Sequence, residues 1–309
     1  MIITVTMNPA VDKTALTSVI VPGGLNRLNN IVVDAGGKGI NVSKMIAALG
    51  GESVATGFLG GSAGQDIEAV LKDLNIKTDF VNIKCTTRTN LKVFCEDFGI
   101  TEFNEPGAAV TSSEMDELYK KLLDYAKPEC IFVFAGSLPQ GVSLDTYRLL
   151  VSAVKEKGAS VFLDADGSAF SCALSAKPDY IKPNKYELMQ YFGKDGDCSL
   201  KECANLCLRL IDKGIGMVAL SMGAEGAMFV TGKDKLYAPG LKVKVLSTVG
   251  AGDSMVGAIV YAAAKNMDIK DTAAIAMAAS AGAVTTQGTK PPCRKTVNEL
   301  VKLVEFQKI

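Results

Sequence analysis

Short runs of apolar and β-branched residues alternate along the chain with longer segments of helical period. The apolar runs predict a first strand close to the N-terminus and buried parallel strands near residues 54, 130, 160, 180 and 217. Between these runs, the spacing of apolar positions predicts helices over 41–50, 112–126, 144–158 and 203–214. This alternation is typical of a doubly wound α/β fold, a mostly parallel sheet flanked by helices, in which ligands bind outside the carboxyl ends of the strands.

Two segments interrupt the alternation. The segments from about residue 12 to 34 and from about residue 86 to 103 have strand patterns without intervening helices. We predict that they form a small sheet covering the site. In the second segment, strand alternation places Arg88, Asn90 and Lys92 on one face, which is either a basic strip facing a ligand or a solvated surface. No linker or internal repeat is evident, so residues 1–309 are predicted to form a single α/β domain whose lid comes from these discontinuous segments.

The composition indicates a small-molecule partner. Lys plus Arg equals Asp plus Glu at 33 each, so no overall positive field attracts the chain to nucleic acid or to anionic membranes. The apolar stretches 255–264 and 273–284 fall short of the roughly 20 residues that cross a bilayer. The N-terminal residues also lack the pattern of a signal peptide. We therefore expect a soluble, cytoplasmic protein.

Cysteine and histidine restrict the possible chemistry. Eight cysteines without a secretory signal favour reduced thiols over a disulfide framework. Cys198, Cys203 and Cys207 lack the paired spacing of zinc sites, and the chain contains no histidine, so we interpret them as packed helix residues. The absence of histidine excludes Ser-His-Asp and Cys-His catalysis and imidazole bases. Carboxylates must therefore perform any acid–base work.

The segment TVGAGDSMVG, residues 248–257, holds the most informative candidate site. Gly250 and Gly252, separated by the methyl group of Ala251, allow successive N–H groups to point into one concavity at a helix N-terminus, which suits a phosphate. Asp253 lies beside that concavity, where a carboxylate makes sense if it acts on a neighbouring hydroxyl. This is the layout of a phosphoryl-transfer site. The alternative is that Asp253 only caps a helix after a glycine turn.

Further motifs follow the other predicted strands. In AGGKGINVS, residues 35–43, glycines around Lys38 permit close approach of a ligand, and Asn41 is expected to open the next helix; a simple strand–helix turn is the alternative. The motif is no Walker A loop, because Gly39 stands where Ser or Thr would follow the lysine. Asp12 is either a turn residue or a ligand for substrate hydroxyls, and Ser137 presents a hydroxyl at the end of a strand.

Two later motifs are candidates for contacts with a nucleotide. In KPNKYEL, residues 182–188, Asn184 and Glu187 have the spacing of an N-cap and its capping partner, and the same pair could position magnesium-bound water near phosphates. SMGAEGAMF, residues 221–229, predicts a strand, a glycine turn and a second strand whose small residues could border a nucleotide.

In their order along the chain, these motifs resemble the ribokinase-like, phosphofructokinase B family of carbohydrate kinases. The resemblance covers essentially the whole chain and rests on NPAVD, GGKGIN, GFLGG, GSLPQG, KPNKYEL, SMGAEGA and TVGAGD. Within the family, TVTMNPAVD, TRTNLKV, TEFNEPG and STVGAGDSMVG are most similar to the bacterial 1-phosphofructokinase branch. Tagatose-6-phosphate kinases are the nearest competitor, and their glycine motif more often carries Ser at the position of Ala251.

The resemblance implies an ATP- and Mg²⁺-dependent sugar-phosphate kinase that converts fructose 1-phosphate to fructose 1,6-bisphosphate, with a tagatose-6-phosphate or fructose-6-phosphate kinase as the alternative. It implies that Asp253 is the general base and that the amides of Gly250, Ala251 and Gly252 form the anion hole. The residues implied for sugar hydroxyls are Asp12, Gly37 and Asn41, and those implied for the acceptor's phosphate are Lys38, Arg88, Asn90, Ser137 and Arg27. The residues implied for the nucleotide are Asn184, Glu187, Ser221, Gly223, Gly226 and, near the adenine, Gly282. Glu187 would hold magnesium through water, and a homodimer through the lid is a further expectation.

Two other classes of protein fit the sequence less well than a kinase does. A dinucleotide-binding oxidoreductase is disfavoured because no G-x-G-x-x-G follows the first strand. A catalytically silent sugar-phosphate sensor is disfavoured because Asp253 and its glycines are intact.

Overall fold

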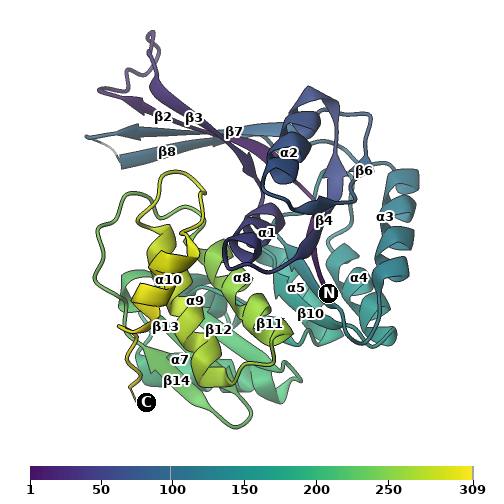
Figure 1. Cartoon of the computed structure of the whole chain (residues 1–309), viewed down its shortest axis with the longest axis vertical. Helices are drawn as coiled ribbons and strands as arrows, with labels where there is room; N and C mark the ends of the chain where they lie inside the picture. Colours follow the sequence, from purple (N-terminus) through teal and green to yellow (C-terminus); the bar gives the residue numbers. More distant parts are fainter. Residues whose placement is uncertain (98, 308–309) are drawn as a thin grey trace.

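The computed structural model describes residues 1–97 and 99–307, and these form a large sheet with helices on both faces and a smaller sheet that projects from one corner (Figure 1). The strands of the large sheet are β1 (Ile2–Thr6), β4 (Ser53–Leu59), β5 (Lys77–Thr78), β6 (Val81–Asn82), β9 (Ile131–Ala135), β10 (Ser160–Asp164), β11 (Tyr180–Ile181), β12 (Met217–Ser221), β13 (Ala227–Thr231) and β14 (Lys235–Ala238).

The strand order of the large sheet is β14-β13-β12-β11-β10-β9-β1-β4-β5, with β6 paired to β4. All of these pairs are parallel except β12 with β13 and β13 with β14. Strand β1 lies between β4 and β9, and all five of its residues are buried. Each apolar run that predicted a parallel strand forms one, because continuous apolar sequence suits a strand covered on both faces.

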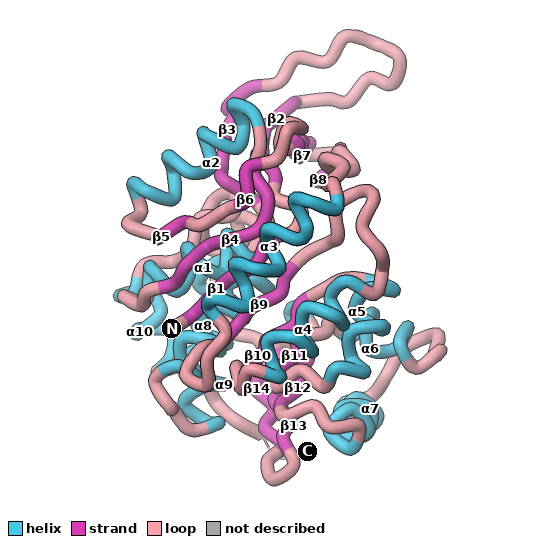
Figure 2. Tube along the Cα trace, turned by 90° about the vertical axis from the view of Figure 1, so that its right-hand side faces the viewer, coloured by secondary structure: helices cyan, strands magenta, loops and turns pink. Residues whose placement is uncertain are grey.

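Helices cover the two faces of the large sheet, as Figures 1 and 2 show from two directions. One hydrophobic cluster joins the sheet to α3, α4 and α7, and another joins it to α1, α8, α9 and α10. The helices are α1 (Lys38–Ala48), α2 (Gly61–Asp73), α3 (Ser112–Tyr125), α4 (Thr146–Glu156), α5 (Gly167–Ala173), α6 (Lys185–Tyr191), α7 (Leu200–Asp212), α8 (Ala251–Ala264), α9 (Ile269–Ala283) and α10 (Arg294–Val301). Among the described residues, none of these helices combines the length and hydrophobicity that crossing a bilayer requires.

Helix α7 shows how local sequence sets an element boundary. The helix was predicted from residue 203 but begins at Leu200, because Ser199 and Glu202 form a capping box that supplies partners for the first N–H groups. Cys203 and Cys207 lie on its buried face and pack in the core, as predicted, whereas Cys198 is buried just before the cap.

The small sheet, called the lid below, has the strand order β3-β2-β7-β8. Its strands are β2 (Ala10–Thr17), β3 (Asn29–Gly36), β7 (Arg88–Cys95) and β8 (Gly99–Asn104), and position 98 of the predicted lid segment lies outside the described residues. Strands β2 and β7 are parallel neighbours, which places Asp12 opposite Asn90. The predicted doubly wound α/β fold with a small second sheet is confirmed.

Candidate active site

A cavity of about 420 Å³ lies between the lid and the carboxyl ends of two central strands. Thr6 ends β1 and Ala135 ends β9, and both line the cavity. The predicted site residues that line it are Asp12, Gly37, Lys38, Asn41, Arg88, Asn90, Ser137, Gly250 and Asp253. Their segments are distant in sequence, and the fold brings them to the edge of the sheet where ligands bind in open α/β folds.

Asp253 lies in the first turn of α8, beside the predicted anion-binding amides. Gly250 precedes the helix with φ 77°, a left-handed conformation that favours glycine and turns the chain sharply into α8. The first N–H groups of a helix have no partner within it, so those of Ala251 and Gly252 are available to an anion. The Asp253 carboxylate accepts a hydrogen bond from Asn41 Nδ2 at 2.8 Å and makes no capping bond to its own helix.

Opposing influences act on the charge of Asp253. Burial raises the pKa of the Asp253 carboxyl, and the nearby Asp164 carboxylate raises it further. The hydrogen bond from Asn41 and the charges of Lys38 and Lys182 act in the opposite direction. The net effect is a raised pKa, which suits a carboxylate that accepts a proton during a reaction.

Helix α1 approaches β1 closely at Gly37. This residue has φ 112°, and a Cβ atom there would lie 2.7 Å from Thr6 Cγ2, so only glycine permits the approach. The helix begins at Lys38 and not at Asn41 as expected, since the Asn41 N–H already donates to Gly37 O at 3.0 Å. Asn41 is therefore buried one turn inside the helix, where its side chain reaches Asp253.

The lid places Asp12, Asn90 and Lys92 in the cavity. Asp12 accepts a hydrogen bond from Asn90 Nδ2 at 3.0 Å, and Lys92 Nζ lies 3.5 Å from the second carboxylate oxygen. Asp12 and Lys92 are both buried. Since Arg88 lines the same cavity, the basic side of β7 faces inward.

Arg88 makes no ion pair among the described residues, although the Asp12 and Glu105 carboxylates are near enough to favour its charge. Its Nη1 donates to Glu105 O at 2.8 Å and its Nη2 to Asn8 O at 3.1 Å, both neutral carbonyl groups. Its Nε atom is buried and has no hydrogen-bond partner among those residues. Burial lowers the pKa of Arg88, but a guanidinium remains charged in proteins, so the group is suited to an anionic ligand.

Lys38 enters a network of ion pairs that the sequence analysis missed. Its Nζ lies 2.6 Å from Asp166 Oδ1 and 3.9 Å from Asp164 Oδ1, and Lys182 Nζ lies 3.4 Å from the same Asp164 atom. Burial opposes the charge on Lys38, but Asp164 and Asp166 outweigh it and raise the pKa. The signal for both carboxylates was present, because the sequence DAD stands at the carboxyl end of a buried strand, where ligand-binding residues gather.

Asn8 is another cavity residue that was not predicted. Its Nδ2 donates to Ser137 Oγ at 3.2 Å and to Pro106 O at 3.1 Å, so it joins the ends of β1 and β9 to the segment after the lid. Both Asn8 and Ser137 line the cavity. Asn8 belongs to the NPAVD motif, which was the available signal.

The residues predicted for the nucleotide lie around the start of α6 and the end of β12. Asn184 and Glu187 form a complete capping box, with Glu187 N donating to Asn184 Oδ1 and Asn184 N to Glu187 Oε2, each at 2.8 Å. Asn184 also pairs with Ser221, and Gly223 and Gly226 form the turn into β13. Asn184 and Glu187 therefore form the N-cap and capping partner that their spacing indicated. Burial raises the pKa of Glu187, and Lys182 partly offsets this effect.

Arg27 and Gly282 are also absent from the lining of the cavity. Arg27 is exposed in the segment between β2 and β3. Gly282 lies in α9, where a Cβ atom would come within 2.8 Å of Pro292 Cβ, so it allows close packing against the segment before α10. Their contacts with substrate and adenine stay predictions.

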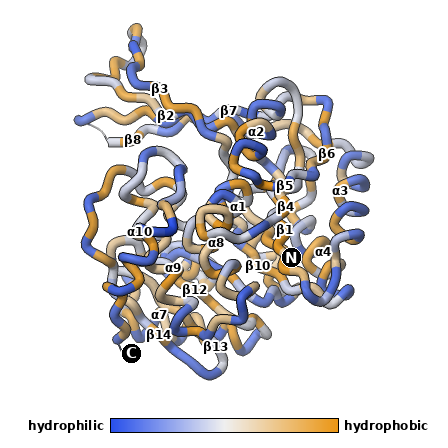
Figure 3. The backbone as a smooth tube through the Cα atoms, in the orientation of Figure 1, coloured by the Kyte–Doolittle hydropathy of each residue, from blue (hydrophilic) through white to orange (hydrophobic). Residues whose placement is uncertain are grey.

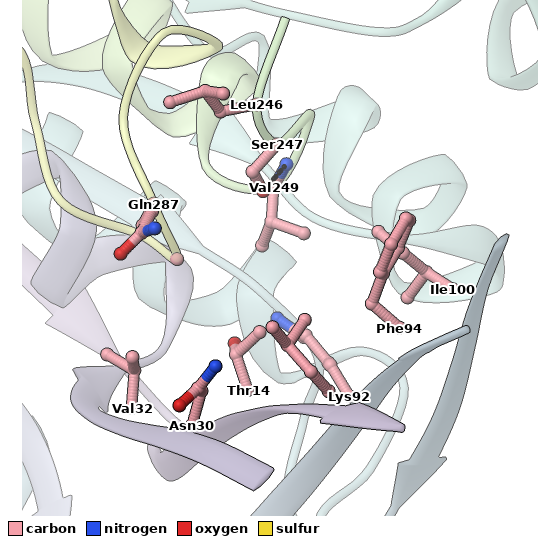
Figure 4. Close-up of a pocket in the computed structure, with 12 residues that line it drawn as sticks. Thr14, Asn30, Val32, Lys92, Phe94, Ile100, Leu246, Ser247, Val249 and Gln287 are labelled. Atoms are coloured by element: carbon pink, nitrogen blue, oxygen red, sulfur yellow. Dashed lines mark hydrogen bonds between the residues drawn. The ribbon is translucent and has the colours of Figure 1, made fainter. Parts of the chain in front are cut away.

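A second cavity, of about 400 Å³, adjoins the first (Figure 4). Lys92 and Val249 line both cavities. On the lid side the second cavity is lined by apolar residues such as Phe94 and Ile100, and on the core side by Leu246 and Ser247. The space between lid and core therefore extends beyond the charged region around Asp253.

The doubly wound sheet, with a small second sheet beside a cavity at the carboxyl ends of its strands, is the fold of the ribokinase-like kinases. Residues 5–296 match the pfkB family of carbohydrate kinases, and the chain belongs to this family. It is 32% identical to 1-phosphofructokinase of Vibrio cholerae over 98% of this chain and 96% of that protein. It is 34% identical to ATP-dependent 6-phosphofructokinase isozyme 2 of Escherichia coli over 94% of both chains. A crystal structure of Escherichia coli phosphofructokinase-2 with substrates and products matches with a TM-score of 0.93, 32% identity and coverage of 98% and 99% of the two chains. The predicted family is confirmed.

Proposed function

We propose that the protein transfers the γ-phosphoryl group of ATP to the 6-hydroxyl of fructose 1-phosphate, forming fructose 1,6-bisphosphate and ADP. The observation that carries this proposal is the Arg88 guanidinium, which makes no ion pair among the described residues and lines the same cavity as Asp253 and Gly250. A kinase for a neutral sugar has no need of such a charge near its acceptor. The name of the Vibrio cholerae relative supports the same substrate.

Asp253 is the proposed general base. The acceptor hydroxyl attacks the γ-phosphorus, the bond to the β-phosphate oxygen breaks, and the hydroxyl proton passes to the Asp253 carboxylate. Asn41 holds that carboxylate in place through the bond at 2.8 Å. The amides of Gly250, Ala251 and Gly252 stabilise the negative charge of the transferring group, and such preorganised donors supply much of the catalysis in phosphoryl transfer.

The acceptor is proposed to lie between the lid and α1. Its hydroxyls would contact Asp12, Gly37 and Asn41, while its phosphate would contact Arg88, Asn90, Lys38 and Ser137. This arrangement places a phosphate beside the guanidinium that lacks a carboxylate partner. It leaves the other end of the sugar for Asp253.

Magnesium suits the carboxylates on the nucleotide side. Asp164 Oδ2 is buried without a hydrogen-bond partner among the described residues, so it has a lone pair available for a cation or its water. No group of three or more acidic or thiol side chains forms a metal cage within the described part of the chain. Mg²⁺ typically keeps several waters and binds one or two carboxylates together with phosphates. Asp164 and, through water, Glu187 would hold the ion, which neutralises phosphate charge when bound.

The second candidate is a kinase for a sugar 6-phosphate, supported by the similarity to 6-phosphofructokinase isozyme 2. An ADP-release assay over fructose 1-phosphate, fructose 6-phosphate, tagatose 6-phosphate, fructose and ribose distinguishes the candidates. We expect the highest kcat/KM for fructose 1-phosphate. A higher value for either 6-phosphate would replace the proposed substrate, and a preference for a neutral sugar would remove the phosphosugar assignment altogether.

A homodimer formed through the lid completes the proposal. The lid exposes Ile31, Val33 and Phe103 with more than half of each side chain accessible (54%, 58% and 57%). Figure 3 shows hydrophobic stretches that continue along the lid strands, away from the core. Exposed apolar residues gathered on a projecting sheet are typical of an interface, and a second copy of the lid presents the same surface.

A further inference from the structure

Lys44 is a buried cation close to the proposed base that the proposed mechanism does not use. It lies on α1, one turn after Asn41, and only 5% of it is exposed. Its Nζ donates to Asn41 Oδ1 and to Thr289 Oγ1, each at 3.2 Å. Among the described residues no carboxylate lies within ion-pair distance of it. A buried ammonium group held by two neutral acceptors is costly, and burial lowers its pKa.

The contact with Asn41 determines how the Asn41 amide is oriented. An ammonium group can only donate hydrogen bonds, so the amide must present its oxygen to Lys44. The amide nitrogen then points to Asp253, to which it donates at 2.8 Å. If the amide flipped, two oxygen atoms would face each other at the proposed base, and the ionised carboxylate would be repelled.

Thr289 connects Lys44 to the turn at Gly250, where the proposed anion-binding amides begin. Thr289 lines the cavity, and a Cβ atom on Gly250 would lie 3.5 Å from its Cα atom. The Thr289 N–H donates to Asp34 Oδ2 at 3.5 Å. Lys44 thus links the helix that carries Asn41 to the segment that supports the start of α8.

We propose that Lys44 is a positioning residue for phosphoryl transfer: it fixes the Asn41 amide with Nδ2 toward Asp253, so that the carboxylate stays ionised and aimed at the acceptor hydroxyl. This inference rests on the proposed function, in which Asp253 is the base. It adds a residue that touches neither substrate and acts through Asn41.

A double-mutant cycle tests this dependence. Lys44→Met keeps an unbranched side chain of similar length but removes the donor, and we expect kcat to fall about ten- to a hundredfold, the usual weight of a hydrogen bond to a charged group. In an Asn41→Ala background, Lys44→Met should reduce kcat by less than about twofold. Equal losses in both backgrounds would overturn the proposal, because Lys44 would then act independently of Asn41.

The pH profile of kcat/KM distinguishes a role of Lys44 in orienting the Asn41 amide from a role in the stability of the fold alone. Lys44→Met should move the acidic limb of kcat/KM to higher pH, because Asp253 loses a hydrogen bond that favours its charged form. The charged groups that face Asp253 and Lys44 in this region are Asp12, Asp34, Lys38, Lys92, Asp164 and Lys182. Ser43→Ala is the matched control, because Ser43 is buried on the same helix and contacts Thr4 and Ser53 at 2.7 and 2.9 Å. It should lower the thermal midpoint and leave the acidic limb in place; an equal shift in this control would overturn the proposal.

Lys44→Gln covers the case in which Lys44→Met fails to fold. Glutamine is neutral but retains an N–H donor for Asn41 Oδ1, so we expect kcat within about threefold of the wild-type value, well above that of a variant without the donor. A folded Lys44→Gln protein that loses as much activity as Asn41→Ala would contradict the inference. The proposed function has its own test. If Asp253→Asn retained the wild-type kcat, Asp253 would not be the general base, whatever the effect of the Lys44 substitutions.

Discussion

Replacing Arg88 by alanine tests the substrate class most directly. The side chain donates to two backbone carbonyls, of Glu105 and Asn8, and has no carboxylate partner among the described residues. Its charge is therefore available to a bound phosphate without breaking an ion pair. A charge-assisted hydrogen bond to a phosphate contributes roughly 1.5–3 kcal/mol, so Arg88→Ala should raise the KM for fructose 1-phosphate about ten- to a hundredfold.

Steady-state kinetics with three variable substrates would measure this effect. The KM for ATP should change little, and any KM for unphosphorylated fructose should also change little, because neither ligand is proposed to reach Arg88. Arg148→Ala is the matched control, since Arg148 on α4 pairs with Asp145, the residue before that helix, and does not line the cavity. It should leave every kinetic constant near its wild-type value.

Stability must be measured alongside activity in this variant. Arg88→Ala also removes the two hydrogen bonds that join β7 to Asn8 and Glu105, which costs about 1–3 kcal/mol in total. A thermal melt with and without fructose 1-phosphate separates a general loss of fold from a loss of ligand binding. An unchanged KM for fructose 1-phosphate in a folded variant would refute the assignment of Arg88 to the acceptor's phosphate.

Three further substitutions test the base, the anion hole and the lid. Asp253→Asn should lower kcat about 10²–10⁴-fold, as loss of a general base typically does. It should also raise the thermal midpoint at neutral pH. The pKa of Asp253 is higher in the folded than in the unfolded protein, so the folded state loses stability as pH rises from the unfolded to the folded pKa. Asparagine does not ionise, so the variant does not lose this stability. Near-wild-type kcat or a clearly lowered midpoint would contradict these expectations. Ala251→Val should crowd the amides and lower kcat more than it raises the KM for sugar, with a limit of about 3 kcal/mol for one lost donor; a change in sugar affinity alone would assign these amides to the acceptor's phosphate. Val33→Asp should convert a dimer to a monomer in light scattering, because it places a charge at the proposed interface, and a monomeric wild-type protein would exclude that interface.

Most of the fold could be predicted from the sequence, because buried parallel strands and amphipathic helices leave simple patterns. The end of β1 shows where the pattern stops being informative. Asn41 was expected to open α1, but the helix begins at Lys38, because Gly37 packs against Thr6 and starts the helix without a side-chain cap. That packing depends on a strand more than thirty residues earlier, and no local signal encodes it.

The site residues that belong to sequence motifs could be predicted, whereas those outside the motifs could not. Asn41 and Asp253 were both predicted, although no sequence pattern indicates a hydrogen bond between residues 212 positions apart. Lys44 was missed, because a lysine on an amphipathic helix normally faces solvent. It is buried by tertiary packing around α1, which includes the contact with Thr289, 245 positions later.

The ion pairs in the cavity indicate which cation supplies affinity for the acceptor. Lys38 is predicted to contact the phosphate, yet it already lies 2.6 Å from Asp166, and that pair must open before the lysine can reach a ligand. When Lys38 leaves the Asp166 carboxylate for a phosphate, the net gain in binding free energy is only the difference between two similar ionic contacts. Lys182 is held in the same way by Asp164. Arg88 has no ion pair to break, so its interaction with a phosphate should contribute more net free energy than that of either lysine, and the preference for a phosphorylated sugar should depend on Arg88 most.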